Sequence, residues 1–93
     1  MLKNKKNTLL ENDLKESKKY TKTIMNKIAN LLDDAGYAYV ENESKTEIIV
    51  YNYQYENNVR KIIGLLDVDK KLIDILITTD IIHDKVFIRL VTI

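Results

Sequence analysis

The sequence predicts an α+β fold, a two-layer sandwich in which a four-stranded, mainly antiparallel sheet carries helices on one face. Three observations predict it. A long segment has apolar residues at helical spacing, two pairs of segments rich in β-branched and aromatic residues have the form of hairpins, and a shorter helical segment separates the pairs. The expected order is therefore α-β-β-α-β-β. From a length of 93 residues we expect a single domain, over residues 8–93.

The first element is a helix predicted from Thr8 to Gly36. Side chains that would share one helical face recur alternately four and three residues apart: Leu10, Leu14, Ser17, Thr21, Ile24, Ile28, Leu31 and Ala35. Thr8 and Glu11 have the spacing of a capping box at the helix start, and Gly36 can take the left-handed conformation that ends a helix. Two members of this apolar face, Ser17 and Thr21, are polar, so we expect the half of the helix after Tyr20 to lie in the core. Residues 1–7 are predicted to form a mobile basic arm.

The next two elements are strands over residues 37–41 and 46–53, joined by the polar residues 42–45. Pairing Glu41 with Thr46 sorts their side chains onto two faces. One face then carries Tyr37, Tyr39, Ile48 and Val50, and the other carries Ala38, Val40, Ile49 and Tyr51. Both faces of this hairpin are largely apolar.

A second, shorter helix is predicted from Tyr55 to Leu66. Its apolar residues keep helical spacing: Tyr55, Val59, Ile62, Ile63 and Leu66. Gly64 costs about 1 kcal/mol relative to alanine inside a helix. We therefore expect the helix to be short or to end near this glycine, followed by a polar turn over residues 67–71.

The last two strands are predicted over residues 72–82 and 85–93, with a two-residue turn at His83 and Asp84. Placing Ile82 opposite Lys85 separates the side chains into two sets. The first set is Ile73, Ile75, Ile77, Thr79, Ile81, Val86, Ile88, Leu90 and Thr92; the second is Asp74, Leu76, Thr78, Asp80, Ile82, Lys85, Phe87, Arg89, Val91 and Ile93. A helix over residues 69–78 is the alternative, because its apolar residues also fit helical spacing.

Composition narrows the class of protein. The chain is 45% hydrophobic and 31% charged, which is typical of a folded domain. It has no cysteine, and no apolar run approaches the roughly 20 residues that cross a bilayer. We therefore expect a cytoplasmic protein that does not contact membranes.

No residue pattern indicates catalysis. His83 is the only histidine, and its neighbours Asp80 and Asp84 suggest a metal site or a general base. A second nitrogen or sulfur ligand is missing, so we interpret this segment as a solvated turn. The acidic residues 67 and 69 lack the further ligands and the glycine of a calcium loop, and the acidic pair 33–34 falls at the predicted C-terminus of a helix, so we interpret both as ordinary solvated acids. We expect no enzyme, no metal, no cofactor and no small-molecule substrate.

The sheet face away from the helices carries the strongest functional signal. Exposed apolar patches of this kind usually mark contacts with other molecules. The predicted protein-interface residues are Ile49, Tyr51, Tyr53, Leu76, Phe87, Val91 and Ile93. Either another chain covers this face, or the first half of the long helix folds over it.

Basic residues are concentrated near the N-terminus. Residues 1–30 contain eight lysines and three acidic residues. Lys15, Lys18, Lys19 and Lys22 fall on one side of the predicted helix and are candidates for contact with nucleic acid or with an acidic partner. A solvated helix face is the simpler interpretation of the same lysines.

The function expected from these observations is that of a small non-enzymatic protein-binding module, in the form of a homodimer. Heavy use of Lys, Asn and Ile is typical of AT-rich genomes. This composition and the short chain favour a viral or mobile-element regulator or inhibitor that occupies a host protein surface. The alternative is a nucleic-acid-binding protein that uses the basic helix and the tyrosines.

Overall fold

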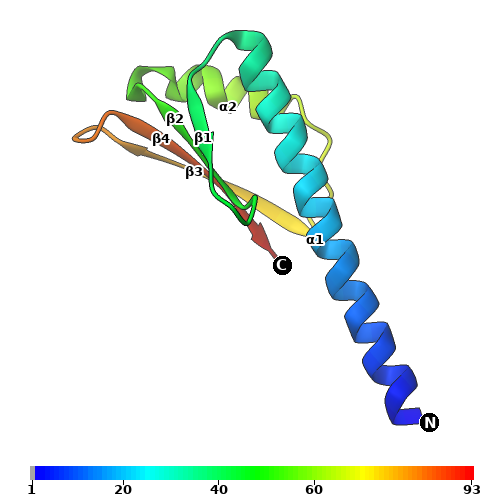
Figure 1. Ribbon diagram of the computed structural model, residues 1–93. Helices are drawn as coiled ribbons and strands as arrows, with labels where there is room; N and C mark the ends of the chain where they lie inside the picture. The colour runs from blue at the N-terminus through cyan, green and yellow to red at the C-terminus, as the bar shows by residue number, and fades with distance from the viewer. Residues whose placement is uncertain (1) are drawn as a thin grey trace.

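The computed structural model describes the backbone of residues 2–93 and the side chains from Lys18 onward. Its four strands form one open antiparallel sheet in the order β1-β2-β4-β3, and two helices cover one face (Figure 1). The predicted α+β class and element order are confirmed. The elements are α1 (Leu2–Ala35), β1 (Tyr39–Glu41), β2 (Glu47–Tyr51), the 3-10 turn η1 (Tyr53–Tyr55), α2 (Glu56–Gly64), β3 (Ile73–Asp80) and β4 (Lys85–Thr92).

Helix α1 is longer than the sequence indicated. It begins at Leu2 and runs through Thr8, so the predicted helix start at Thr8 is wrong, and residues 2–7 are helical where an arm was expected. Extending a formed helix adds one hydrogen bond per ordered residue, so a local capping signal does not oblige the helix to begin there. The other end follows the prediction. Gly36 has φ 80°, and the Tyr37 N–H donates to the Leu32 carbonyl at 3.0 Å, which closes the helix.

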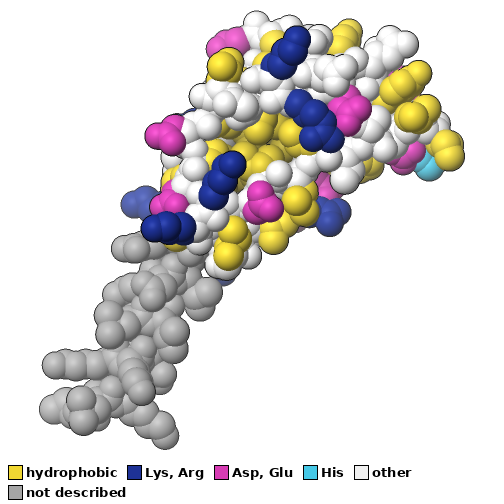
Figure 2. All heavy atoms as spheres, turned by 180° about the vertical axis from the view of Figure 1, so that it is seen from behind, with side chains coloured by type: hydrophobic (Ala, Val, Ile, Leu, Met, Phe, Trp, Pro, Cys, Tyr) yellow, Lys and Arg dark blue, Asp and Glu magenta, His cyan; other side chains and the backbone are white. Residues whose placement is uncertain are grey.

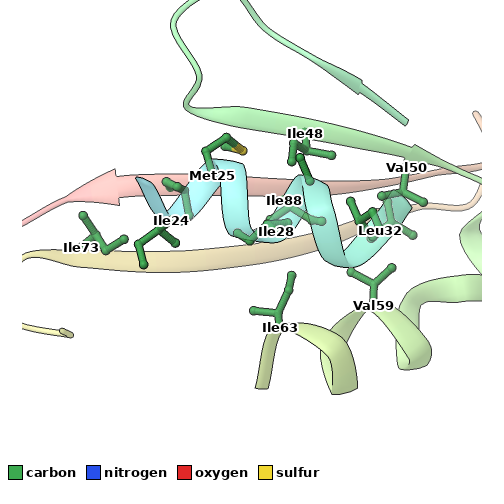
Figure 3. Close-up of a cluster of buried hydrophobic side chains, with 13 residues drawn as sticks. Ile24, Met25, Ile28, Leu32, Ile48, Val50, Val59, Ile63, Ile73 and Ile88 are labelled. Carbon is green, nitrogen blue, oxygen red and sulfur yellow. The ribbon is translucent and has the colours of Figure 1, made fainter. Parts of the chain in front are cut away.

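The core lies between the second half of α1, α2 and the inner face of the sheet, the face that the helices cover (Figure 3). Burying one aliphatic side chain the size of valine, leucine or isoleucine contributes roughly 1.5–3 kcal/mol to the free energy of unfolding. The predicted placement of the core after Tyr20 is confirmed. The buried core residues are Ile24, Met25, Ile28, Ala29, Leu32, Ile48, Val50, Val59, Ile63, Ile73, Val86, Ile88 and Leu90.

Both hairpins have the predicted faces but a different register. Glu41 pairs with Ile48 instead of Thr46, and Lys85 pairs with Asp80 instead of Ile82. Each shift is by two residues, which leaves every side chain on its predicted face because strand side chains alternate with period two. The β3–β4 connection is consequently a four-residue loop, residues 81–84, and not a two-residue turn.

The alternative helix over residues 69–78 is wrong, because β3 begins at Ile73. The sheet is completed by β4, which lies between β2 and β3 and pairs with both. Among the residues that the structure describes, no helix has the length and apolar character required to span a bilayer.

Candidate interaction surface

The sheet face opposite the helices is called the outer face here. Alternation along the strands directs to it every second residue of β2, β3 and β4 together with one residue of β1. Its members are Val40, Glu47, Ile49, Tyr51, Asp74, Leu76, Thr78, Asp80, Lys85, Phe87, Arg89 and Val91.

A line of neighbouring side chains crosses the outer face from one edge to the other, and it is called the apolar row because its members on β1, β2 and β4 are apolar. Val40 pairs with Ile49, Ile49 with Phe87, and Phe87 with Thr78, so one line of neighbours passes over all four strands. Val40 is 44% exposed, whereas Ile49 and Phe87 are half-buried by their neighbours. On one side of the row is a hollow of about 240 Å³, lined by Leu76, Thr78, Phe87 and Arg89.

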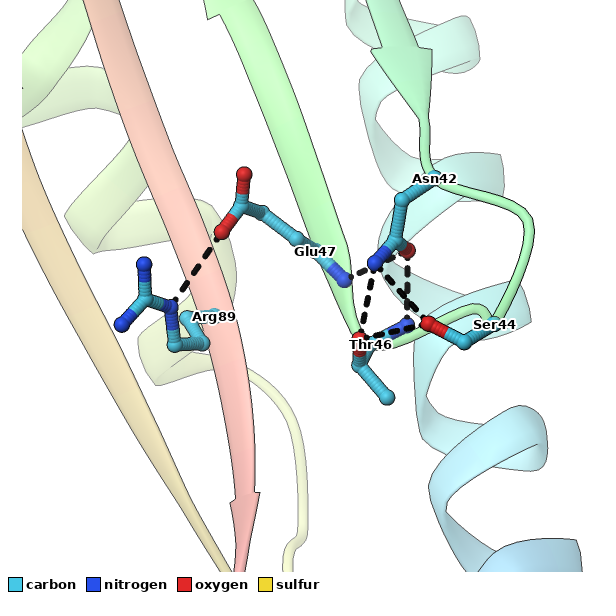
Figure 4. Close-up of polar contacts among 5 residues, drawn as sticks. All are labelled: Asn42, Ser44, Thr46, Glu47 and Arg89. Atoms are coloured by element: carbon cyan, nitrogen blue, oxygen red, sulfur yellow. Dashed lines mark hydrogen bonds and ion pairs between the residues drawn. The ribbon is translucent and has the colours of Figure 1, made fainter.

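Charged residues of both signs border the apolar row. Arg89 Nε lies 3.2 Å from Glu47 Oε2 (Figure 4). On the other side of the row, Lys85 pairs with Asp80 on β3 and with Tyr51 on β2. An exposed ion pair contributes little to stability, about 0–1 kcal/mol. These charges therefore bear more on what the face can contact than on folding.

The structure brings six of the predicted interface residues to this face. Five are Ile49, Tyr51, Leu76, Phe87 and Val91 on the strands. The sixth, Ile93, continues the ladder beyond β4 through its N–H bond to the Leu72 carbonyl and is 72% exposed. Because of the shifted register, Val91 lies opposite Asp74 and not opposite Leu76.

Tyr53 does not belong to the outer face, and its prediction as a strand residue is wrong. Asn52 leaves the extended conformation with φ 82°, and its side chain accepts a hydrogen bond from the Gln54 N–H at 3.0 Å. This cap begins η1, so Tyr53 and Tyr55 lie in a 3-10 turn. Tyr55 then packs on Tyr37 with ring centroids 4.6 Å apart, on the helical side of the sheet.

The lysines of α1 are exposed where the structure describes them. Lys18, Lys19 and Lys22 point away from the core, and the side chain of Lys15 lies outside the described residues. Lys18 and Lys22 also line a cavity between α1 and the sheet. The three lysines thus have different surroundings, although the sequence placed them on one helical side.

His83 lies at the tip of the β3–β4 loop, where it appears in cyan beside hydrophobic side chains in Figure 2. Its neighbours Ile81 and Ile82 are 66% and 90% exposed. The His83 N–H donates to Asp80 Oδ1 at 3.1 Å, and His83 Nδ1 lies 2.7 Å from Asp80 Oδ2. Within the described part of the chain, no three His, Cys, Asp or Glu side chains are grouped so that they could hold a metal ion.

Two features of the outer face were missed by sequence reasoning. Val40 was assigned to this face but not to the interface, and its register partner Ile49 shows that it extends the apolar row. The Glu47–Arg89 ion pair joins residues whose neighbourhood depends on the pairing of β2 with β4, for which the sequence contains no local signal.

Comparisons of this chain with protein-family models, with curated proteins and with solved structures found no match.

Proposed function

We propose that the protein is a small, non-enzymatic protein-binding module that forms a homodimer through the outer face of its sheet. The observation that carries this proposal is the apolar row across a face that neither helix covers in the described structure. Soluble proteins seldom leave a continuous apolar surface of this kind unpartnered.

A second copy of the chain suits this face because the face complements itself. In a two-fold dimer the same patch is used twice, so it must offer both members of each contact. The outer face has the basic residues Lys85 and Arg89, acidic residues to oppose them, and both an exposed aromatic side chain, Tyr51, and a hollow beside Phe87. Aromatic residues and arginine are the commonest anchors of protein interfaces.

The proposed setting is the cytoplasm, and the proposed role is regulation or inhibition by occupation of a surface. The Lys-, Asn- and Ile-rich composition and the short chain favour a viral or mobile-element origin. In such a role, a host protein would compete with the second copy for the outer face. The dimer would then be the form that the protein takes without its target.

The test compares two adjacent residues of β4 that point to opposite faces. Ile88 is fully buried, and Ile88→Asp should unfold the chain because an unpaired carboxylate in the core costs several kcal/mol. Phe87→Asp should keep the fold and convert the dimer into a monomer. Circular dichroism reports folding, and light scattering reports mass.

Two outcomes contradict the proposal. One is a wild-type protein that stays monomeric throughout the micromolar range. The other is a Phe87→Asp variant that unfolds like Ile88→Asp, since this would mean that the outer face is covered within a single chain. Arg89→Ala serves as a second test, and it should weaken the dimer without changing the circular dichroism spectrum.

A nucleic-acid-binding function is the second candidate. It is supported by the exposed lysines Lys18, Lys19 and Lys22 on α1. Binding of this type depends on neutralising phosphates and weakens steeply with added salt. Three of the six tyrosines do not add to it, because Tyr37 and Tyr55 pack on each other beside the core and Tyr20 accepts a hydrogen bond from the Asp69 N–H at 2.6 Å.

A further inference from the structure

A second candidate site lies away from the outer face, between α1, the β1–β2 connection and the end of β4. It is a cavity of about 360 Å³, at the lower end of the range for small-molecule sites. Among the described residues, its lining consists of lysine side chains and of the hydroxyl-bearing side chains of serine and threonine. The lining residues are Lys18, Thr21, Lys22, Ser44, Thr46 and Thr92.

The two lysines of the cavity are cations without local compensation. Lys18 and Lys22 are one helical turn apart, and the residues three and four positions away from either of them include no acid. Within residues 18–93 neither lysine forms an ion pair. No carboxylate lines the cavity among these residues. The two lysines place like charges on the same side of the helix, and an anion would relieve their repulsion.

The hydroxyl groups on the opposite wall are held in place by Asn42 (Figure 4). Asn42 Oδ1 accepts hydrogen bonds from the N–H groups of Thr46 and Glu47, both at 2.9 Å, which fixes the orientation of the amide. Asn42 Nδ2 then donates to Ser44 Oγ at 3.0 Å and to Thr46 Oγ1 at 2.8 Å. The two hydroxyl oxygens lie at fixed positions before any ligand arrives.

This arrangement leaves one hydroxyl proton for a ligand. Ser44 Oγ and Thr46 Oγ1 are 3.0 Å apart, so one of their two protons lies between them. Both oxygens already accept from Asn42, and the second proton has no acceptor among the described residues. One hydroxyl of this wall can therefore donate to a ligand in the cavity that the two lysines also line.

We infer that this cavity binds a small molecule that carries a phosphate group. A phosphate has several oxygens that can accept hydrogen bonds from two ammonium groups and a hydroxyl at once, and its charge of nearly −2 matches two lysines. The carbon atoms of the lysine and threonine side chains give an apolar part of the ligand a surface to contact. The site is independent of the homodimer, because none of its lining residues lies on the outer face.

The experiment is a titration of the wild-type protein with inorganic phosphate and with phenyl phosphate, followed by amide chemical shifts at constant ionic strength. Shifts should be confined to residues 18–22, residues 44–46 and Thr92. Phenyl phosphate should bind with a Kd of about 1 mM or tighter and more tightly than inorganic phosphate. Benzyl alcohol, which has the ring and no phosphate, should leave these shifts unchanged.

Matched lysine variants decide whether the cavity is the site. Lys18→Gln and Lys22→Gln should each weaken binding about tenfold, the usual effect of losing one charge-assisted hydrogen bond. Lys19→Gln and Lys27→Gln, which change exposed lysines of the same helix outside the cavity, should alter the Kd less than about twofold, as expected for screened charges at a distance.

Three results would overturn the inference. One is the absence of localised shifts, and another is an equal loss of affinity in Lys19→Gln and Lys18→Gln. The third is a single-stranded oligonucleotide that binds more tightly than phenyl phosphate and is weakened equally by all the lysine variants. That result would assign the lysines to a nucleic-acid contact along the helix.

Discussion

Asp80 shows how a single carboxylate shapes the β3–β4 loop. It is the last residue of β3, and its two oxygens contact the His83 N–H and the His83 ring. Asp84 completes the loop with φ 57°, a left-handed conformation that Asp tolerates better than most residues, and its Oδ1 accepts from the Tyr53 N–H at 2.9 Å. Local side-chain bonds of this kind replace the glycine that tighter turns use.

The pKa of Asp80 is predicted to lie below its ordinary value of 3.8, first because the His83 N–H donates to the carboxylate and second because the His83 side chain does. Since the folded-state pKa is the lower one, the contact stabilises the fold above about pH 4 and is lost as the pH falls through the folded-state pKa. In His83→Ala the backbone donor remains, so the pKa should rise and still stay below 3.8. A carboxyl NMR titration measures both values, and an Asp80 pKa at or above 3.8 in the wild-type protein would contradict the assignment.

The whole sheet depends on the strand β4. It is paired on both sides, with β2 and with β3, although it comes last in the chain. Its inward residues Val86, Ile88 and Leu90 are all buried against the helices. Removing β4 would therefore divide the sheet as well as open the core.

Deletion of residues 85–93 should abolish cooperative unfolding. Each lost aliphatic side chain contributes roughly 1.5–3 kcal/mol, and three of them approach the whole stability of about 5–15 kcal/mol expected for a domain. The control is Lys61→Ala, which removes an exposed side chain of α2 away from the outer face and should change the free energy of unfolding by less than about 1 kcal/mol. Urea unfolding followed by circular dichroism makes the comparison. A cooperative transition in the truncated chain would show that β4 is dispensable.

The face of each strand residue could be predicted from the sequence, whereas the register could not. Alternation of apolar and polar residues identifies the strand residues that are buried. A shift of the register by two residues leaves these residues on the same face. The register itself follows from two loops. In the first loop, Asn42 Oδ1 accepts hydrogen bonds from the N–H groups of Thr46 and Glu47. In the second, Asp80 Oδ1 accepts a hydrogen bond from the His83 N–H. Both are side-chain bonds that form only once the loop has its shape.

The candidate sites were predictable to different degrees. The outer face follows from alternation, apart from Tyr53, where the alternating tyrosines were misleading and the cap formed by Asn52 was the stronger signal. The cavity beside Lys18 and Lys22 could not be predicted, because its walls come from three segments far apart in the chain. Helical spacing explains why the two lysines lie on the same side of α1. It gives no information about the serine and threonine hydroxyl groups that line the rest of the cavity.

The open sheet has two edges, β1 and β3. In the ladder with β4, alternate residues of β3 direct their backbone groups away from the sheet. Side chains of the same chain occupy part of this edge. Arg60 Nη2 donates to the Ile77 carbonyl at 3.1 Å, and Asp74 Oδ1 accepts from the Ile75 N–H at 2.9 Å. Blocking of this kind protects an edge strand from pairing with another molecule.

Arg60→Ala should uncover the Ile77 carbonyl and allow association through β3. The test is made in the Phe87→Asp background, which removes the proposed contact through the outer face. Phe87→Asp with Arg60→Ala should form a larger species in sedimentation velocity, and Phe87→Asp with Lys61→Ala, which changes the exposed neighbour in α2, should remain monomeric. Equal behaviour of the two double variants would show that Arg60 does not protect the edge.

The two edges of the sheet also limit how large an assembly built by edge pairing can become. β3 has eight residues and β1 only three, so an added strand can pair along a longer edge at β3 than at β1. Strands that pair β3 to β3 in antiparallel fashion are related by a two-fold axis, and the pair leaves only the short β1 edges outward. Growth by this route stops at two copies. Fibre growth by edge pairing alone needs two edges that can each accept a neighbour, and the described sheet has only one edge long enough to do so.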